Sequence, residues 1–334
     1  MFSILASSES TKLYSYDVPW FMYAMVVAAL IGYALIEMHH TKKDHVIQFK
    51  EAVKWSIFYV SLALLFTIPV FMFIGSQAAG EYLGAWAIEK ALSLDNLFVI
   101  GLIFTSFKVS PLLERRMLNY GVAGAIFFRL IFIIAGTSLL KRFEWVSIIF
   151  GLILLHAAWK AFQEARGGGK REEKVEITEK WMWKLIVRIL PVYPKFVGHK
   201  MTIVKDGKRM LTMMAAVVLL IELTDIMFAI DSVPAVLAVS PDRFIAYSSN
   251  VFALLGLRAL FFVYQSVAVK FWALNWALAG ILVWIGFKMI ATPLGFHVNI
   301  GVSLAILFTL LVGSVVVSLR WPREIKEHPI HIAD

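Results

Sequence analysis

Residues 211–239 read LTMMAAVVLLIELTDIMFAIDSVPAVLAV, an almost unbroken apolar run that carries the acids Glu222, Asp225 and Asp231. A helix that crosses a bilayer needs about 20 mostly apolar residues, and this run exceeds that length. Acids are rare in such helices because each costs about 2.5–3.5 kcal/mol near the bilayer centre. The stretch therefore predicts a membrane-spanning helix whose acidic residues have a function.

The composition of the whole chain agrees with this prediction. The chain has 334 residues, of which 60% are hydrophobic and 16% charged, whereas a soluble domain carries about 25% charged residues. This excludes a soluble enzyme, a disordered tail and a fibrous repeat. The absence of cysteine excludes disulfides, thiolate metal sites, iron–sulfur clusters and cysteine nucleophiles.

Apolar windows long enough to span the membrane recur along the chain. We therefore expect an all-α, polytopic membrane protein of about nine transmembrane helices, forming a single transmembrane domain over residues 1–320 with a tail over 321–334. The predicted spans are 19–38, 52–74, 83–107, 117–139, 143–163, 211–239, 246–268, 271–291 and 299–319. Residues 1–18 lack a basic region and a small-residue cleavage site, so no removable signal peptide is expected.

The basic residues predict the orientation. With the N-terminus outside, 24 of the 32 Lys and Arg residues face the cytoplasm, and only Lys12, Lys141, Arg142 and Arg243 lie outside. The positive-inside rule therefore favours an N-terminus outside and a C-terminus in the cytoplasm. This bias also accounts for the net charge of +9 without a nucleic-acid partner.

The long loop over 164–210 falls on the cytoplasmic side. After a flexible break at 167–169, residues 178–190 place Lys180, Lys184 and Arg188 on one helical face, which predicts a basic amphipathic helix on the membrane surface. Asp206-Gly207 predicts a small hairpin. A solvated linker is the expected role of this loop, with regulation as the alternative.

The chain also contains an internal repeat. Residues 89–98 read EKALSLDNLF and residues 225–234 read DIMFAIDSVP, so that in each an acid is followed six residues later by Asp and then by Asn or Ser. Two further landmarks recur in order: Asn119 and Arg129 with Asn250 and Arg258, and Gly151 and Lys160 with Gly280 and Lys288. Repeats over about 83–163 and 211–291 would hold three helices each. Three is odd, so an inverted repeat follows, with the first, second and last helices peripheral.

Five acids inside the predicted spans cannot simply face lipid. They are Glu89, Asp95, Glu222, Asp225 and Asp231. Arg129 and Arg258 could neutralise two of them, either to hold helices together or to take part in function. Glu37 and Lys90 are expected near the interface or snorkelling, and His156 is expected to be packed rather than a ligand.

Helical spacing limits how these acids could bind one ion. Glu89 and Asn96 share a helix face, as do Asp225 and Ser232, whereas Asp95 and Asp231 lie about 120° around the helix from their leading acids. Either a helix is interrupted, with a kink expected at Pro234, or both repeats contribute ligands. Carboxylate, amide, hydroxyl and carbonyl oxygens suit Mn²⁺, Mg²⁺ and Ca²⁺, with protons as counter-ions.

These stretches resemble the signature sequences of the TerC family, and length and loop pattern are most similar to its Alx-type branch. The signature stretches are residues 89–99, 222–235 and 249–260, and the likeness runs from about the first predicted helix to the ninth, including residues 50–52. It implies a bacterial inner-membrane protein linked by name to tellurium resistance, with manganese export, alkaline response and metal supply to exported enzymes as proposed activities. On the matching positions, the metal path would comprise Glu89, Asp95, Asn96, Asp225, Asp231 and Ser232. Glu222, Thr224, Arg129 and Arg258 would serve proton coupling or support the ligands.

The leading hypothesis is a proton-coupled exporter of Mn²⁺ or a similar divalent cation. The alternative is a non-transporting membrane scaffold or sensor in envelope stress or metal delivery. An enzyme is not expected: the Gly-x-Gly-Asp context of intramembrane aspartyl proteases is absent, and His156 alone does not supply the paired histidines of a haem site. Expected partners are the metal ion, membrane lipids, and a second copy or envelope proteins, with no permanently bound cofactor.

Overall fold

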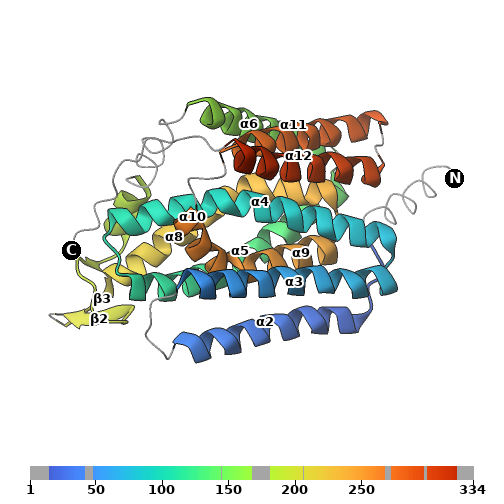
Figure 1. Ribbon diagram of the computed structural model, residues 1–334. Helices are drawn as coiled ribbons and strands as arrows, with labels where there is room; N and C mark the ends of the chain where they lie inside the picture. Colours follow the sequence, from blue (N-terminus) through green and yellow to red (C-terminus); the bar gives the residue numbers. More distant parts are fainter. Residues whose placement is uncertain are drawn as a thin grey trace.

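The computed structural model describes residues 15–41, 48–143, 145–167, 181–205, 207–267, 272–296 and 299–321. These residues form a bundle of long helices with one small sheet at its end (Figure 1). The helices are α2 (Trp20–Thr41), α3 (Phe49–Phe73), α4 (Ser76–Ser106), α5 (Pro111–Arg142), α6 (Val146–Gly167), α8 (Met213–Val239), α9 (Arg243–Leu255), α10 (Leu257–Val267), α11 (Leu274–Ala291) and α12 (Ile300–Arg320).

Most of these helices are long and apolar enough to cross a bilayer. Among the described residues, seven qualify, namely α2, α3, α5, α6, α8, α11 and α12, and the bent pair α9 and α10 makes an eighth. The 31-residue α4 is outside this set, and it carries Glu81, Glu89, Lys90 and Asp95 along its length. The protein is thus an integral, multi-pass membrane protein.

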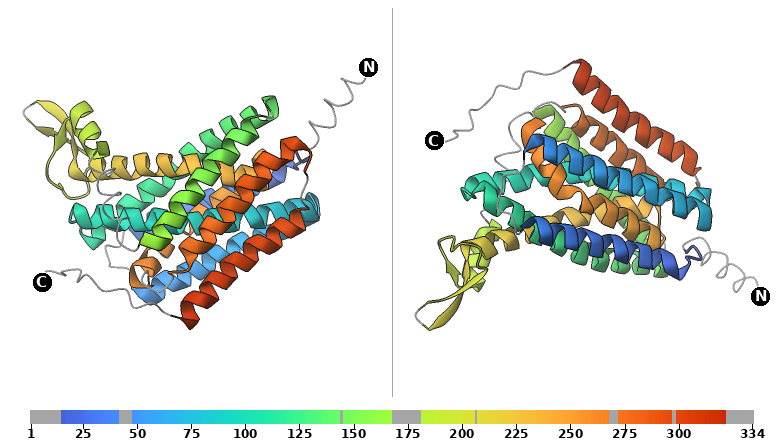
Figure 2. Two further views of the ribbon diagram at one scale, coloured as in Figure 1. Left: turned by 90° about the horizontal axis from the view of Figure 1, so that it is seen from above. Right: turned by 60° about the horizontal axis from the view of Figure 1, so that its bottom comes forward.

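The charged helix α4 lies in the middle of the bundle, where it packs against α3, α8, α9 and α12 (Figure 1). Helices α6, α11 and α12 lie together on one side, and α2 lies at the opposite edge (Figures 1 and 2). Burial of α4 among neighbours explains why its charges are tolerated, since a charged side chain facing lipid has no partner.

The contacts give the relative directions of the central helices. Gly84 and Asn96 of α4 meet Val239 and Asp225 of α8, so α4 and α8 run antiparallel. On α5, Gly121 and Gly136 meet Ile221 and Leu237 of α8, so α5 and α8 run parallel. Contacts of Glu89 with Asn250 and of Phe104 with Phe261 make α4 parallel to the α9–α10 pair.

Two glycines allow α6 and α11 to cross at close range. A Cβ at Gly151 would lie 2.8 Å from the carbonyl oxygen of Gly286, and a Cβ at Gly286 would lie 3.0 Å from that of Gly151. Farther along, Phe162 packs against Trp276, so the two helices are antiparallel. Small residues of this kind let helix backbones approach each other in membranes.

One of the long apolar windows is interrupted, but not the one that contains Pro234. Helix α8 runs as one element from Met213 to Val239 and includes Pro234, whereas the window 246–268 is divided into α9 and α10 with a bend of 45°. Gly256 lies at the break. Gly256 packs closely against Tyr59 of α3. A Cβ added at Gly256 would lie 3.0 Å from the Cβ of Tyr59, so a larger residue at this position would crowd α3.

The loop before α8 contains the predicted hairpin. Strand β2 (Thr202–Lys205) pairs antiparallel with β3 (Lys208–Thr212), and β1 (Val192–Tyr193) pairs parallel with β3. A helix is described from 181 to 189. It buries Met182 and Ile186 but leaves Trp181 63% and Ile189 66% exposed. The hairpin and its flanking helix project from the bundle where α2 ends and α5 begins (Figures 1 and 2). Residues 168–180, including Lys180 and part of the predicted break, lie outside the described residues, as does most of the tail.

Candidate functional site

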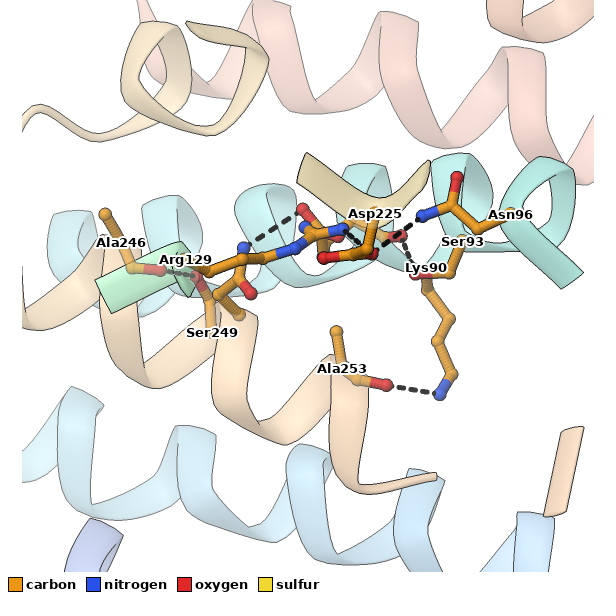
Figure 3. A network of polar contacts seen from close by, with 10 residues as sticks. Lys90, Ser93, Asn96, Arg129, Asp225, Ala246, Ser249 and Ala253 are labelled. Carbon is orange, nitrogen blue, oxygen red and sulfur yellow. Dashed lines mark hydrogen bonds and ion pairs between the residues drawn. The ribbon is translucent and has the colours of Figure 1, made fainter. Parts of the chain in front are cut away.

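The centre of the bundle holds an arginine between two carboxylates. Arg129 of α5 donates through Nη1 to Oε1 of Glu89 on α4 and through Nη2 to Oδ1 of Asp225 on α8, the latter at 3.3 Å (Figure 3). Arg129 and Glu89 are fully buried, and the side chain of Asp225 is 12% exposed. One guanidinium thus joins the leading acids of the two repeated stretches.

Two amides complete this central network, which we define as Glu89, Asn96, Arg129, Asp225 and Asn250. Asn250 of α9 donates through Nδ2 to Oε2 of Glu89 at 3.1 Å, and Asn96 of α4 donates to Oδ1 of Asp225 at 3.5 Å. Four helices therefore contribute: α4, α5, α8 and α9. Glu89 and Asn96 lie on one face of α4, as their spacing predicts, and both halves of the chain contribute to the network, which is one of the two alternatives that the spacing left open.

Several buried oxygens near this network have no hydrogen-bond partner among the described residues. They are Oδ2 of Asp225, Oδ1 of Asn250 and Oγ of Ser232. A buried polar atom without a partner costs about 1–3 kcal/mol, and these are hard oxygen donors of the type that bind divalent cations. A bound cation or a proton would satisfy these oxygens.

Glu222 lies one turn before Asp225 and faces α5. An added Cβ at Gly124 would lie 2.0 Å from Oε1 of Glu222, so only glycine leaves room for this carboxylate. Oε2 of Glu222 is buried and also has no partner among the described residues. Thr224 is buried and donates to the carbonyl of Leu220 at 2.8 Å, so its hydroxyl serves its own helix in this state.

Asp231 points in a different direction from the central network. It is partly buried, and the charged groups that act on it are Lys160 and His156 of α6. His156 is exposed on the surface of α6, so the expectation that it is packed is wrong. The side chain of Asp95 lies outside the described residues, although its backbone belongs to α4.

Three charged residues are located where the sequence did not predict them. Arg258 pairs with Glu37 of α2, and not with the central acids; Glu37 is only 5% exposed, so its carboxylate faces the interior of the bundle. Lys90 does not snorkel, since its Nζ donates to the carbonyl of Ala253 at 2.8 Å. That carbonyl belongs to the last turn of α9, where the break leaves carbonyls without helical donors, and a cation is favourable at a helix C-terminus.

Two further buried acids, Glu81 and Asp242, lie at one end of the central helices and are joined by Tyr16. Tyr16 donates through its hydroxyl to Oε1 of Glu81 at 2.8 Å and through its backbone N–H to Oδ2 of Asp242 at 2.9 Å. Ser240 donates to the other oxygen of Glu81 at 2.6 Å. Burial beside Glu81 raises the pKa of Tyr16, so the phenol stays protonated and donates. The sequence analysis missed this contact because it joins residues far apart in the chain.

A preformed metal cage is not seen in the described part of the chain. Its His, Asp and Glu side chains form no group of three or more that could hold a metal ion together. The six proposed metal-path residues are thus only partly assembled: Glu89, Asn96 and Asp225 converge, whereas Asp231 is directed toward α6. This arrangement defines an integral membrane protein with a charge-compensated, acidic interior.

Comparison with known proteins gives the family. Residues 74–326 match the Integral membrane protein TerC family, and the chain belongs to it. A protein of Rickettsia felis named only as an uncharacterized membrane protein is 38% identical over 90% of this chain and 97% of its own length. One of Escherichia coli K12, provisionally named a membrane-bound redox modulator, Alx, is 34% identical over 90% of this chain and 93% of its own. No solved structure matches.

Proposed function

We propose that this protein exports Mn²⁺ or a similar hard divalent cation from the cytoplasm in exchange for protons. The observation that carries the proposal is the meeting of Glu89 and Asp225, the leading acids of the two repeated stretches, around a single arginine. Glu89, Asp95, Asn96, Asp225, Asp231 and Ser232 are the proposed metal path. Glu222, which has one buried oxygen without a partner among the described residues, is the proposed proton carrier.

The directions of the helices support two inverted repeats. If α4, α5 and α6 correspond to α8, the α9–α10 pair and α11, then a two-fold axis in the membrane plane requires α4 and α8 to be antiparallel, and likewise α6 and α11. The same axis would place α8 on α4 and α5 on α9, so the contact between α4 and α9 would correspond to the contact between α8 and α5. Both of these pairs are parallel, as the axis requires. If the α9–α10 pair is one span and α4 is a further span, the described helices make the nine spans that we propose, and an odd number fits a cytoplasmic C-terminus.

The central arginine suggests how transport is coupled to charge. With Glu89 and Asp225 ionised, a guanidinium between them leaves one negative charge uncompensated. A divalent cation that binds both carboxylates must displace Arg129 from this position, because like charges cannot share it at these distances. Arg129 thus acts as an internal counter-ion that holds the cation-free state together, and protonation of Glu222 adjusts the remaining charge.

The alternative is a membrane scaffold or sensor that transports nothing. It is favoured by the pairing of Arg129 with two acids, since buried ion pairs also hold helices together. The name of the Alx relative, a membrane-bound redox modulator, fits a scaffold that acts on redox chemistry through partner proteins. With no cysteine, this chain itself cannot undergo thiol–disulfide exchange.

Flux into proteoliposomes tests the proposal. Purified protein is reconstituted with a Mn²⁺-sensitive dye inside the vesicles, and a pH gradient is imposed. We expect Mn²⁺ flux that depends on the gradient and is lost in the variants Glu89→Gln, Asp95→Asn, Asp225→Asn and Asp231→Asn. The matched control is Asp17→Asn, which removes an exposed carboxylate outside the helices.

The outcomes separate the two functions. If Asp95→Asn and Asp231→Asn transport Mn²⁺ as the parent protein does, the proposed metal path is wrong. If no flux is detected while envelope proteins still copurify with the folded protein, the scaffold function replaces transport. Cellular manganese, measured with and without the protein at neutral and alkaline pH, tests the direction of transport.

A further inference from the structure

The segment over residues 15–19, which we call the N-terminal strap, lies across one end of two central helices. Tyr16 donates through its hydroxyl to Glu81 of α4 at 2.8 Å and through its backbone N–H to Asp242, the N-cap residue of α9, at 2.9 Å. Tyr16 packs against the buried core, whereas its two neighbours in the sequence are exposed. The strap thus joins α4 to α9 through one side chain and one backbone group.

The two anchors of the strap, Glu81 and Asp242, lie beyond the central network on one side. Glu81 precedes Glu89 by eight residues on α4, and Asp242 precedes Asn250 by eight residues at the start of α9. Because these helices are parallel and Asn250 is bonded to Glu89, both anchors lie about 12 Å along the helices from the network, at a rise of 1.5 Å per residue. Helices α2, α4 and α9 begin at this end, opposite the hairpin (Figure 1), and it is the outer end in the proposed orientation.

Small side chains separate the anchors from the network on both helices. Ala85 on α4 and Ala246 on α9 each lie four residues after the anchor of their helix and four residues before its network residue. Residues four apart lie on the same side of a helix. Both alanines are fully buried in one hydrophobic cluster. The stretch between the network and the outer end therefore carries only methyl groups on this side of each helix, and the strap lies over its end.

Each anchor has a further partner that holds it in place without the strap. Glu81 also accepts hydrogen bonds from Ser240 at 2.6 Å and from Gln77 at 3.1 Å. Asp242 also accepts one from the backbone N–H of Ile245 at 2.9 Å. Release of the strap breaks two hydrogen bonds but leaves each carboxylate with a donor, so neither pays the cost of a buried acceptor without a partner. The strap is thus separable from the helix ends that it joins.

From these contacts we infer that the N-terminal strap is an outer gate over the central network, with Tyr16 as its latch. In the state that the structure shows, the gate is closed. Release of Tyr16 frees α4 from α9 at the outer end and connects the network to the outside along Ala85 and Ala246. The inference rests on the proposed function for what passes the gate, a divalent cation that leaves the cell, whereas the opening is measured without transport.

Cysteine accessibility in intact cells tests the gate, because the chain has no cysteine of its own. The reporter is Ser249→Cys, at a fully buried position of α9 next to Asn250. We expect it to react slowly with a membrane-impermeant thiosulfonate in the otherwise unchanged protein. Adding Tyr16→Phe should raise the rate about tenfold, since the hydrogen bond of the phenol to a charged group is lost.

The matched control is Tyr23→Phe, which removes a phenol at the same end, where the ring of Tyr23 packs against Phe244 of α9 at 4.8 Å between centroids. A second reporter, Ser93→Cys, is buried on α4 four residues beyond Glu89, on the far side of the network. Its rate should not change, whereas a general loosening of the fold would raise the rates of both reporters.

The outcomes are distinct. A fast reaction of Ser249→Cys before any change at Tyr16, equal effects of Tyr16→Phe and Tyr23→Phe, or a rise at both reporters would overturn the gate. Thermal unfolding confirms that each variant is folded, and Ala246→Cys replaces Ser249→Cys if that variant is not. If Tyr16→Phe opens the gate while the parent protein shows no Mn²⁺ flux in proteoliposomes, the proposed transport fails and the gate stands.

Discussion

At the scale of single residues, Arg129 decides how the buried acids are tolerated. Its guanidinium contacts both Glu89 and Asp225, which come from different halves of the chain. Among buried charges, removing one partner leaves the other charge without compensation. Arg129, Glu89 and Asp225 therefore stabilise the fold mainly through their mutual charge interactions, and less through the packing of each side chain.

We predict that Arg129→Gln destabilises the protein by about 3–5 kcal/mol, the cost of breaking a buried ion pair. Glu89→Gln removes one of the two acids, so the double variant Glu89→Gln/Arg129→Gln should recover part of this loss. Thermal unfolding in detergent measures both effects. Additive losses in the double variant would show that the two side chains are not coupled.

Gly124 has a specific role beside Glu222. An added methyl group would lie 2.0–2.2 Å from the carboxylate atoms of Glu222, so we expect Gly124→Ala to cost about 1–3 kcal/mol through overpacking. The cost should largely disappear in the Glu222→Ala background, as measured by thermal unfolding. Gly32→Ala is the control, because an added Cβ there meets nothing within 4 Å. If both glycine variants behave alike, the loss is a general effect of the substitution.

At the scale of elements, the pairs of helices matter more than the individual spans. Helices α6 and α11 approach each other through Gly151 and Gly286, each of which faces the carbonyl oxygen of the other. Such a reciprocal contact is what a two-fold axis between the helices produces. Helix α9, in contrast, ends at Gly256 inside the bundle, and Lys90 donates to its freed end.

This reciprocity predicts similar effects from two distant substitutions. Gly151→Ala and Gly286→Ala should each destabilise the protein by about 1–3 kcal/mol, because backbone atoms cannot rotate out of the way as side chains do. Gly313→Ala, which meets nothing within 4 Å, should be near neutral. Unfolding temperatures of the three variants check this, and a large loss at only one of the two crossing glycines would argue against the symmetry.

At the scale of the whole molecule, the lack of cysteine makes the orientation directly testable. We expect Asp17→Cys, at an exposed position before α2, to react with an impermeant maleimide in intact cells. Lys184→Cys, exposed on the helix over 181–189, should react only after permeabilisation, because the basic loops face the cytoplasm. The reverse pattern would invert the proposed orientation.

The sequence predicted more of the central network than of its surroundings. Glu89, Asn96 and Asp225 were predicted because acids and amides in apolar windows are rare and recur at matched spacing. Arg258 was assigned to the wrong acids, and Lys90 and Glu37 to the interface. Lys90 contacts Ala253 because α9 breaks at Gly256, and Arg258 pairs with Glu37 because of where α2 lies. Neither the break nor the position of α2 produces a periodic pattern in the sequence.

The sequence by itself determined that the protein crosses a membrane several times and that Glu89 and Asp225 lie within apolar helices, because both follow from the composition along one chain. The tertiary structure alone decided which acid meets which cation. A helix's periodicity defines its faces, but the contact between two faces depends on how closely the backbones approach at glycines such as Gly124 and Gly151. For this reason Asp225 lies beside Glu89 and Arg129, while Asp231, six residues later on the same helix, is directed toward α6.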